Sequence, residues 1–77
     1  MTFIEQQILD SLMTLEAAAA RMAGANPKPD LLPIFSRLDE LTGQLPPDTE
    51  PDLLHFLHRK SYHKACALLQ QRQRGNI

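Results

Sequence analysis

The amino-acid sequence predicts an all-α fold, a small antiparallel three-helix bundle in which residues 1–77 form a single domain. Composition is the first indication, since 13 Leu and 8 Ala stand against four Ile, four Thr and no Val or Trp. Strands favour the β-branched and aromatic residues that are scarce here, whereas Leu and Ala favour helices. Two further indications are apolar residues that recur at helical spacing and two proline-rich segments that divide the chain into three.

The first helix is expected over about residues 2–23. Its apolar positions follow steps of three and four, which keeps them on one helix face. They are Ile4, Ile8, Leu12, Leu15, Ala19 and Met22. Thr2 and Glu5 have the spacing of a capping box, in which a hydroxyl and a carboxylate satisfy free backbone N–H groups at a helix start.

The second helix is expected over about residues 30–43. The segment GANPKPD (24–30) precedes it, and its two prolines impose extended geometry on the residues before them, which indicates an ordered turn. Asp30 is suited to be the N-cap, and Pro33 is tolerated in a first turn whose N–H groups lack partners. The apolar residues recur at heptad spacing, as in one helix of a bundle. They are Leu31, Ile34, Leu38, Leu41 and Leu45.

The third helix is expected over about residues 50–72, after the segment QLPPDTEPD (44–52), with Thr49 and Asp52 spaced as a cap and a frayed tail at 73–77. Its apolar residues form two groups, 53–57 and 62–69, on either side of the polar run His58–Ser61. The centres of the two groups differ by about 100° around a helix. Either the helix is kinked or broken near Ser61, which is a suitable new N-cap, or it is straight and packs against two neighbours.

Charge is divided along the chain. Residues 1–52 contain nine acids and three bases, whereas residues 53–77 contain five bases and no acid, and the net charge is -1. The near-neutral total argues against strong non-specific attraction to nucleic acid or to an anionic membrane. We expect the basic last helix to pack beside the acidic helices, with opposite charges meeting at the rims.

The cellular setting that fits the sequence is the cytoplasm. A single Cys forms no internal disulfide, and this favours a reducing compartment. The N-terminus has no basic flank followed by an apolar stretch, and no window approaches the roughly 18 apolar residues that span a bilayer. Neither export nor membrane association is expected, and no cofactor is indicated.

The segment HFLHRKSYHKAC (55–66) contains every histidine and the single cysteine of the chain, which raises the question of a metal site. His55, His58, His63 and Cys66 are residue types that zinc prefers. In a straight helix, however, His55 and Cys66 are about 16 Å apart, whereas zinc ligands lie within about 2.3 Å of the ion. We therefore assign no metal ligands, and a site completed across a dimer interface is left open.

Enzymatic function is not expected either. Cys66 lies between Ala65 and Ala67 and precedes two leucines, which is the setting of a small core residue. No glycine-rich loop that could stabilise an oxyanion is nearby, so we assign no catalytic residue.

The sequence alone does not identify a function beyond that of a small helical domain, and a protein–protein interaction or adaptor module is the interpretation we favour. The expected contact surface consists of Phe56, Arg59, Lys60, His63 and Lys64, which combine an aromatic anchor with basic groups that select an acidic protein partner. Homodimerisation is also compatible with this surface.

Nucleic-acid binding through the basic third helix is the alternative interpretation. A last helix rich in Arg, Lys and His on a helical scaffold has the outline of a helix-turn-helix domain. Against it stand the excess of acids over bases in the whole chain and the length of the proline-rich connections.

Overall fold

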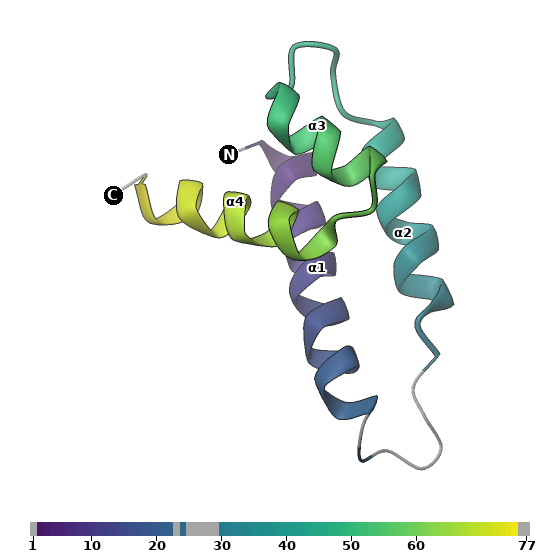
Figure 1. Cartoon of the computed structure of the whole chain (residues 1–77). Coiled ribbons are helices and arrows are strands. Elements are labelled where there is room, and N and C mark those ends of the chain that lie inside the picture. The colour runs from purple at the N-terminus through teal and green to yellow at the C-terminus, as the bar shows by residue number, and fades with distance from the viewer. Residues whose placement is uncertain (1, 23, 25–29, 76–77) are drawn as a thin grey trace.

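The computed structural model describes residues 2–22, 24 and 30–75, and these residues are all-α, as the sequence predicts (Figure 1). They form four helices: α1 (Phe3–Met22), α2 (Leu32–Gly43), α3 (Pro51–His58) and α4 (Tyr62–Gly75). The expected three-helix bundle is therefore not confirmed, because the segment predicted as the third helix forms two. The break that the sequence analysis left open near Ser61 lies at residues 59–61.

Helix α1 begins with the predicted capping box. The Glu5 N–H donates to the Thr2 hydroxyl at 3.2 Å, and the Thr2 N–H donates to the Glu5 carboxylate at 3.2 Å. The Thr2 hydroxyl also donates to the Glu5 carboxylate at 2.9 Å. These contacts satisfy backbone donors that a helix start otherwise leaves free.

Helix α2 runs antiparallel to α1 (Figure 1) and begins two residues later than expected. Leu31, not Asp30, is its N-cap and makes no side-chain cap. The Asp30 carboxylate instead accepts a hydrogen bond from the Leu32 N–H at 3.0 Å. Most of the predicted turn before the helix, residues 25–29, lies outside the described residues.

Helix α3 begins at Pro51 with Glu50 as its N-cap. The expected cap between Thr49 and Asp52 is wrong, since the N-cap lies one residue after Thr49 and makes no side-chain cap. The Glu50 carboxylate contacts Arg72 of α4 instead. The proline at the first helical position is well placed, because its fixed φ suits a helix and its missing N–H would lack a partner there.

A tight turn of three residues, Arg59–Ser61, separates α3 from α4. Lys60 has a φ of 58°, which is the left-handed region. The Ser61 N–H donates to the Phe56 carbonyl at 2.8 Å, and the Lys60 N–H donates to the Leu57 carbonyl at 3.1 Å. This pair of bonds is a Schellman motif with Lys60 at the position where glycine is usual. The motif ends α3, and α4 starts in a new direction directly after Ser61.

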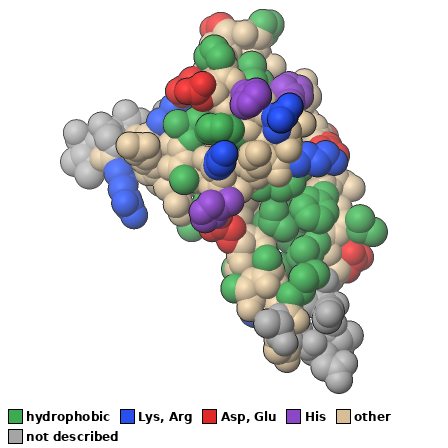
Figure 2. Space-filling view, viewed as in Figure 1, with side chains coloured by type: hydrophobic (Ala, Val, Ile, Leu, Met, Phe, Trp, Pro, Cys, Tyr) green, Lys and Arg blue, Asp and Glu red, His purple; other side chains and the backbone are tan. Residues whose placement is uncertain are grey.

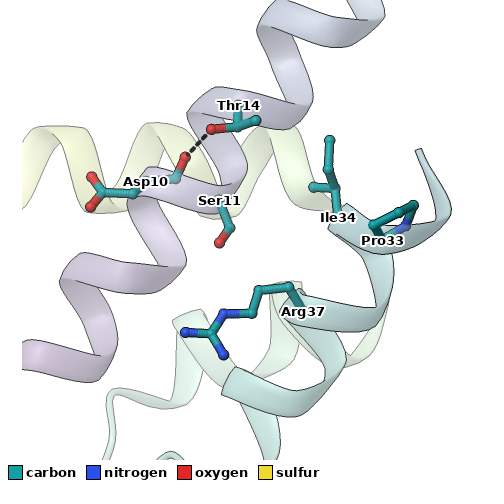
Figure 3. A pocket seen from close by; sticks show the side chains of 6 residues that line it. All are labelled: Asp10, Ser11, Thr14, Pro33, Ile34 and Arg37. Carbon is teal, nitrogen blue, oxygen red and sulfur yellow. Dashed lines mark hydrogen bonds between the residues drawn. The ribbon is translucent and has the colours of Figure 1, made fainter. Parts of the chain in front are cut away.

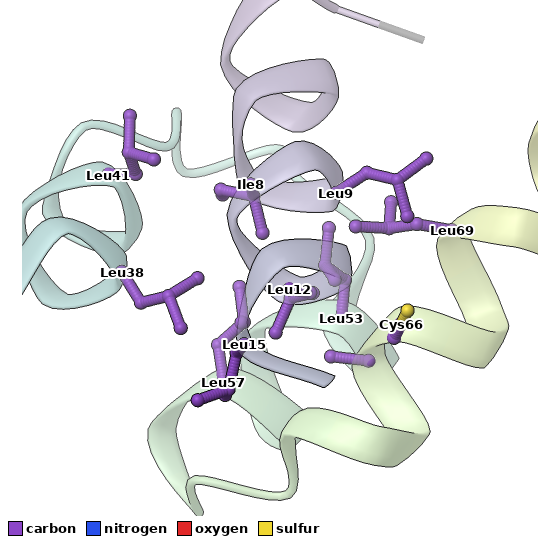
Figure 4. Close-up of a cluster of buried hydrophobic side chains, with 11 residues drawn as sticks. Ile8, Leu9, Leu12, Leu15, Leu38, Leu41, Leu53, Leu57, Cys66 and Leu69 are labelled. Atoms are coloured by element: carbon purple, nitrogen blue, oxygen red, sulfur yellow. The ribbon is translucent and has the colours of Figure 1, made fainter. Parts of the chain in front are cut away.

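The core is built by all four helices, and α4 crosses α1 (Figures 1 and 4). Because of the Arg59–Ser61 turn, both apolar groups of the predicted third helix face the core. They contribute Leu53 and Leu57 from α3 and Ala65, Cys66 and Leu69 from α4. The members contributed by α1 and α2 are Ile8, Leu9, Leu12, Leu15, Leu38 and Leu41. Helix α4 continues to Gly75, so residues 73–75, which the sequence analysis assigned to the tail after its third helix, are helical. Residues 76–77 lie outside the described residues. Among the helices of the described part, none is both long and apolar enough to cross a bilayer.

Arg72, near the C-terminal end of α4, forms ion pairs with residues at the starts of α1 and α3. Its guanidinium lies against the carboxylate of Glu5 at the start of α1 and against that of Glu50 at the start of α3. The expected meeting of the basic last helix with acidic helices is present at this point. Burial raises the pKa of Glu5, but hydrogen bonds from Thr2 and the charge and hydrogen bond of Arg72 outweigh it and hold the pKa below its usual value.

Replacing Glu5 by Gln is expected to lower the free energy of unfolding at pH 7 by about 1–3 kcal/mol, because a charged hydrogen-bond acceptor is lost from a buried position. A carboxyl group whose pKa is lowered by folding stabilises the protein above its unfolded pKa, about 4.3, and that contribution is lost as the pH falls through the folded pKa. The difference between wild type and Glu5→Gln in urea unfolding should therefore shrink between about pH 5 and pH 3.

The exposed acid Glu40 supplies the matched control, since Glu40→Gln should change the free energy of unfolding little at either pH. A difference between wild type and Glu5→Gln that stays constant over this pH range would contradict the role assigned to Glu5.

Candidate functional site

The five residues predicted as a contact surface lie on either side of the α3–α4 turn. Phe56 comes from α3, Arg59 and Lys60 from the turn, and His63 and Lys64 from the first turn of α4. The last four are exposed, and Phe56 is partly buried. We call these five residues the turn surface. Figure 2 shows histidine and Lys or Arg side chains gathered over α3 and the start of α4.

The turn surface carries three cations, Arg59, Lys60 and Lys64, and among the described residues none of them forms an ion pair with a carboxylate. His63 differs, since its Nδ1 lies 3.1 Å from the Glu16 carboxylate of α1. Arg72, on the same helix, is engaged by Glu5 and Glu50. Three exposed cations without an ion pair among the described residues therefore lie together at the turn.

Phe56 is less exposed than the aromatic anchor that the sequence analysis expected. Its side chain packs against the hydrophobic core, and its carbonyl is the acceptor of the bond that closes the turn. A centroid distance of 6.1 Å separates its ring from that of His55. Phe56 thus packs on the core side of the turn and accepts one of its hydrogen bonds, while the exposed residues of the turn surface are basic.

An apolar row that the sequence analysis missed lies next to the turn surface. It consists of Leu32, Phe35 and Tyr62. The rings of Phe35 and Tyr62 stack with centroids 5.8 Å apart, and Leu32 is 69% exposed one helical turn before Phe35. Leu32 and Phe35 are three residues apart and lie beside the main Leu stripe of α2, which is the one sequence signal for the row.

Burial raises the pKa of the Tyr62 hydroxyl, and the negative charge of Asp39 raises it further. Tyr62 stays protonated at neutral pH and can donate or accept a hydrogen bond. Asp39 is thus a negatively charged residue whose field acts on a member of the apolar row.

The histidines and the cysteine of segment 55–66 are divided between two helices, with His55 and His58 in α3 and His63 and Cys66 in α4. Among residues 2–22, 24 and 30–75, no group of three His, Cys, Asp or Glu side chains is placed to hold a metal ion. Cys66 is 1% exposed and belongs to the core (Figure 4). Burial raises the pKa of its thiol, and the charge of Glu16 and a hydrogen bond to it act in the same direction, so the thiolate is disfavoured.

A shallow groove of about 270 Å³ lies between α1 and α2 (Figure 3). Its lining is made of Asp10, Ser11, Thr14, Pro33, Ile34 and Arg37. Several of its polar groups are already engaged within the chain. The Thr14 hydroxyl donates to the Asp10 carbonyl at 2.9 Å, and Arg37 donates to the Gln7 amide oxygen at 3.2 Å. We therefore place the candidate site at the turn surface and the apolar row.

Comparison of the chain with protein-family models, with curated proteins and with solved structures found no match in any of the three.

Cys66 is expected to react with a thiol reagent at least about 100-fold more slowly in the native protein than in 6 M guanidinium, because labelling requires opening of the core. Stopped-flow or spectrophotometric measurement with an aromatic disulfide at pH 8 gives both rates. The matched control is Ala67→Cys in a Cys66→Ala background, which moves the thiol by one residue to an exposed position and should restore fast labelling. Fast labelling of native wild type would show that Cys66 is not held in the core.

Proposed function

We propose that the chain is a small non-enzymatic protein–protein interaction module that binds an acidic partner through the turn surface. The observation that carries the proposal is the group of three cations at the α3–α4 turn, none of which is neutralised by an ion pair among the described residues. Groups of this kind steer an acidic partner and set its orientation, while nearby apolar contacts supply most of the affinity.

The backbone of the turn supports the same proposal. Lys60 occupies a left-handed position where glycine would be less strained, and the two turn bonds hold it there. A charge placed on a rigid turn loses less conformational entropy on binding than one on a flexible loop. Backbone strain of this kind recurs at functional positions.

The proposal includes the expected setting of the protein. We place it in the cytoplasm, where the buried Cys66 would remain reduced. Binding of a second copy through the same surface remains the competing form of protein association, and native mass measurement separates the two.

Nucleic-acid binding is retained as a second candidate because the α3–α4 connection is tight. The long connections counted against it in the sequence analysis do not include this turn of three residues, which joins an 8-residue helix to a 14-residue helix. Those proportions resemble a helix-turn-helix. The exposed side chains of α4 are all non-acidic and include His63, Lys64, Ala67, Gln71 and Arg74.

Charge-reversed variants test the proposed function. Arg59→Glu/Lys64→Glu should abolish capture of the specific partners that wild type recovers from lysate of the source cell, as measured by quantitative mass spectrometry. The matched control, Arg21→Glu/Arg74→Glu, has the same change of net charge at exposed positions outside the turn surface and should retain those partners. If the Arg59→Glu/Lys64→Glu variant recovers the same partners as wild type in the same amounts, the turn surface is not the contact.

Binding of both variants to a fluorescent DNA duplex separates the second candidate from the first. Phosphate contacts would make wild-type affinity fall steeply between 50 and 200 mM salt, and loss of Arg74 as well as Lys64 would weaken it. If wild type binds no duplex at 50 mM salt, the nucleic-acid candidate is rejected and the protein-binding proposal is unaffected.

A further inference from the structure

We infer that the turn surface and the apolar row form one continuous docking surface, and that its occupant is an amphipathic acidic helix of a partner protein, with aliphatic side chains on one face and carboxylates on the other. The inference rests on the proposed function and specifies the partner. Neither half of the surface alone selects such a segment, because cations would accept any acidic chain and an apolar patch any hydrophobic one.

Tyr62 makes the surface continuous. It follows the turn directly and precedes His63 and Lys64 in the chain, while its ring stacks on Phe35 of α2. Phe35 in turn lies one helical turn from Leu32. Figure 2 shows the corresponding arrangement, with a hydrophobic area over the junction of α1 and α2 directly beside the basic and histidine side chains.

The apolar half has area that a partner could bury. Leu32 is 69% exposed, and Phe35 and Tyr62 are only partly covered although they pack against the core. A single exposed leucine is ordinary on a monomer surface, whereas an exposed leucine continuous with two aromatic rings forms a patch of the kind that binds a hydrophobic side chain.

The charges of the surface orient the occupant. Arg59, Lys60 and Lys64 attract carboxylates at the turn end. Asp39, one helical turn after Phe35 on α2, repels carboxylates from the apolar row, and Glu16 is paired with His63. A bound helix therefore places its acids over the turn and its aliphatic side chains over Leu32.

Phe3, 73% exposed, provides the comparison that gives the inference its test. It lies at the start of α1, outside the turn surface and the apolar row, so Phe3→Ser removes a similar exposed apolar group without touching the docking surface. Both Leu32→Ser and Phe3→Ser should fold, since neither side chain belongs to the buried core.

The probe is a synthetic 18-residue helical peptide with leucines on one face and glutamates on the other, titrated into the ¹⁵N-labelled full chain. Shifts should concentrate at residues 32–39 and 59–64. Leu32→Ser should weaken binding about tenfold or more, because a leucine side chain loses its buried contact, while Phe3→Ser should leave the affinity within about twofold. Lys64→Glu should also weaken binding, more at low salt than at high salt.

Several results would overturn the inference. An all-Glu peptide that binds as tightly as the amphipathic one, with Leu32→Ser unchanged and Lys64→Glu weakened, would leave the basic turn surface as the site and remove the apolar half. If neither Leu32→Ser nor Lys64→Glu changes peptide binding, or if no peptide binds at 1 mM, the docking surface is overturned. Unchanged partner capture by Arg59→Glu/Lys64→Glu is a separate result, and it would overturn the proposed function. A native dimer lost in Leu32→Ser would make a second copy the occupant, and tighter binding of a DNA duplex than of the peptide would make the surface a nucleic-acid site.

Discussion

The left-handed backbone at Lys60 is the constraint on which the arrangement of the other helices depends. If residues 51–75 formed one straight helix, the leucines of α3 and the apolar side chains of α4 would face directions about 100° apart, and one group would leave the core. The turn at Arg59–Ser61 brings Leu53 and Leu69 into the same cluster. It also lets α4 cross α1 and brings Arg72 to the starts of α1 and α3.

The same turn creates the candidate site. A helix interior distributes its charged side chains around the axis, whereas the end of α3, the turn and the start of α4 present Arg59, Lys60 and Lys64 within six residues. At the other end of α4, Arg72 is engaged by two carboxylates, whereas Arg74 is exposed. One basic segment therefore has two roles, holding the fold together at its far end and leaving cations available near its start.

Much of the fold can be predicted from local patterns in the sequence. The capping box at Thr2 and most of the apolar stripes depend on spacing alone, although Ala19 of the predicted first stripe is exposed and Leu9 and Ala18 are buried. The shift between the two apolar groups in the last third of the chain predicts either a break near Ser61 or a straight helix with two neighbours, and the structure has the break. The left-handed Lys60 could not be predicted, because glycine usually occupies that position. Contacts between distant residues were also out of reach, as with Arg72 and Glu5, or Phe35 and Tyr62, since spacing carries no information on which helix ends meet.

The most direct test of the central claim is the free energy of unfolding of Lys60→Gly, measured by urea denaturation with Lys60→Ala as the control for loss of the charge. At a left-handed position glycine relieves strain, so Lys60→Gly should be more stable than Lys60→Ala by about 1 kcal/mol. In an unbroken helix the sign is reversed, because glycine is about 1 kcal/mol less favourable than alanine in a helix interior. A Lys60→Gly protein less stable than Lys60→Ala would contradict the left-handed turn and the surface built on it.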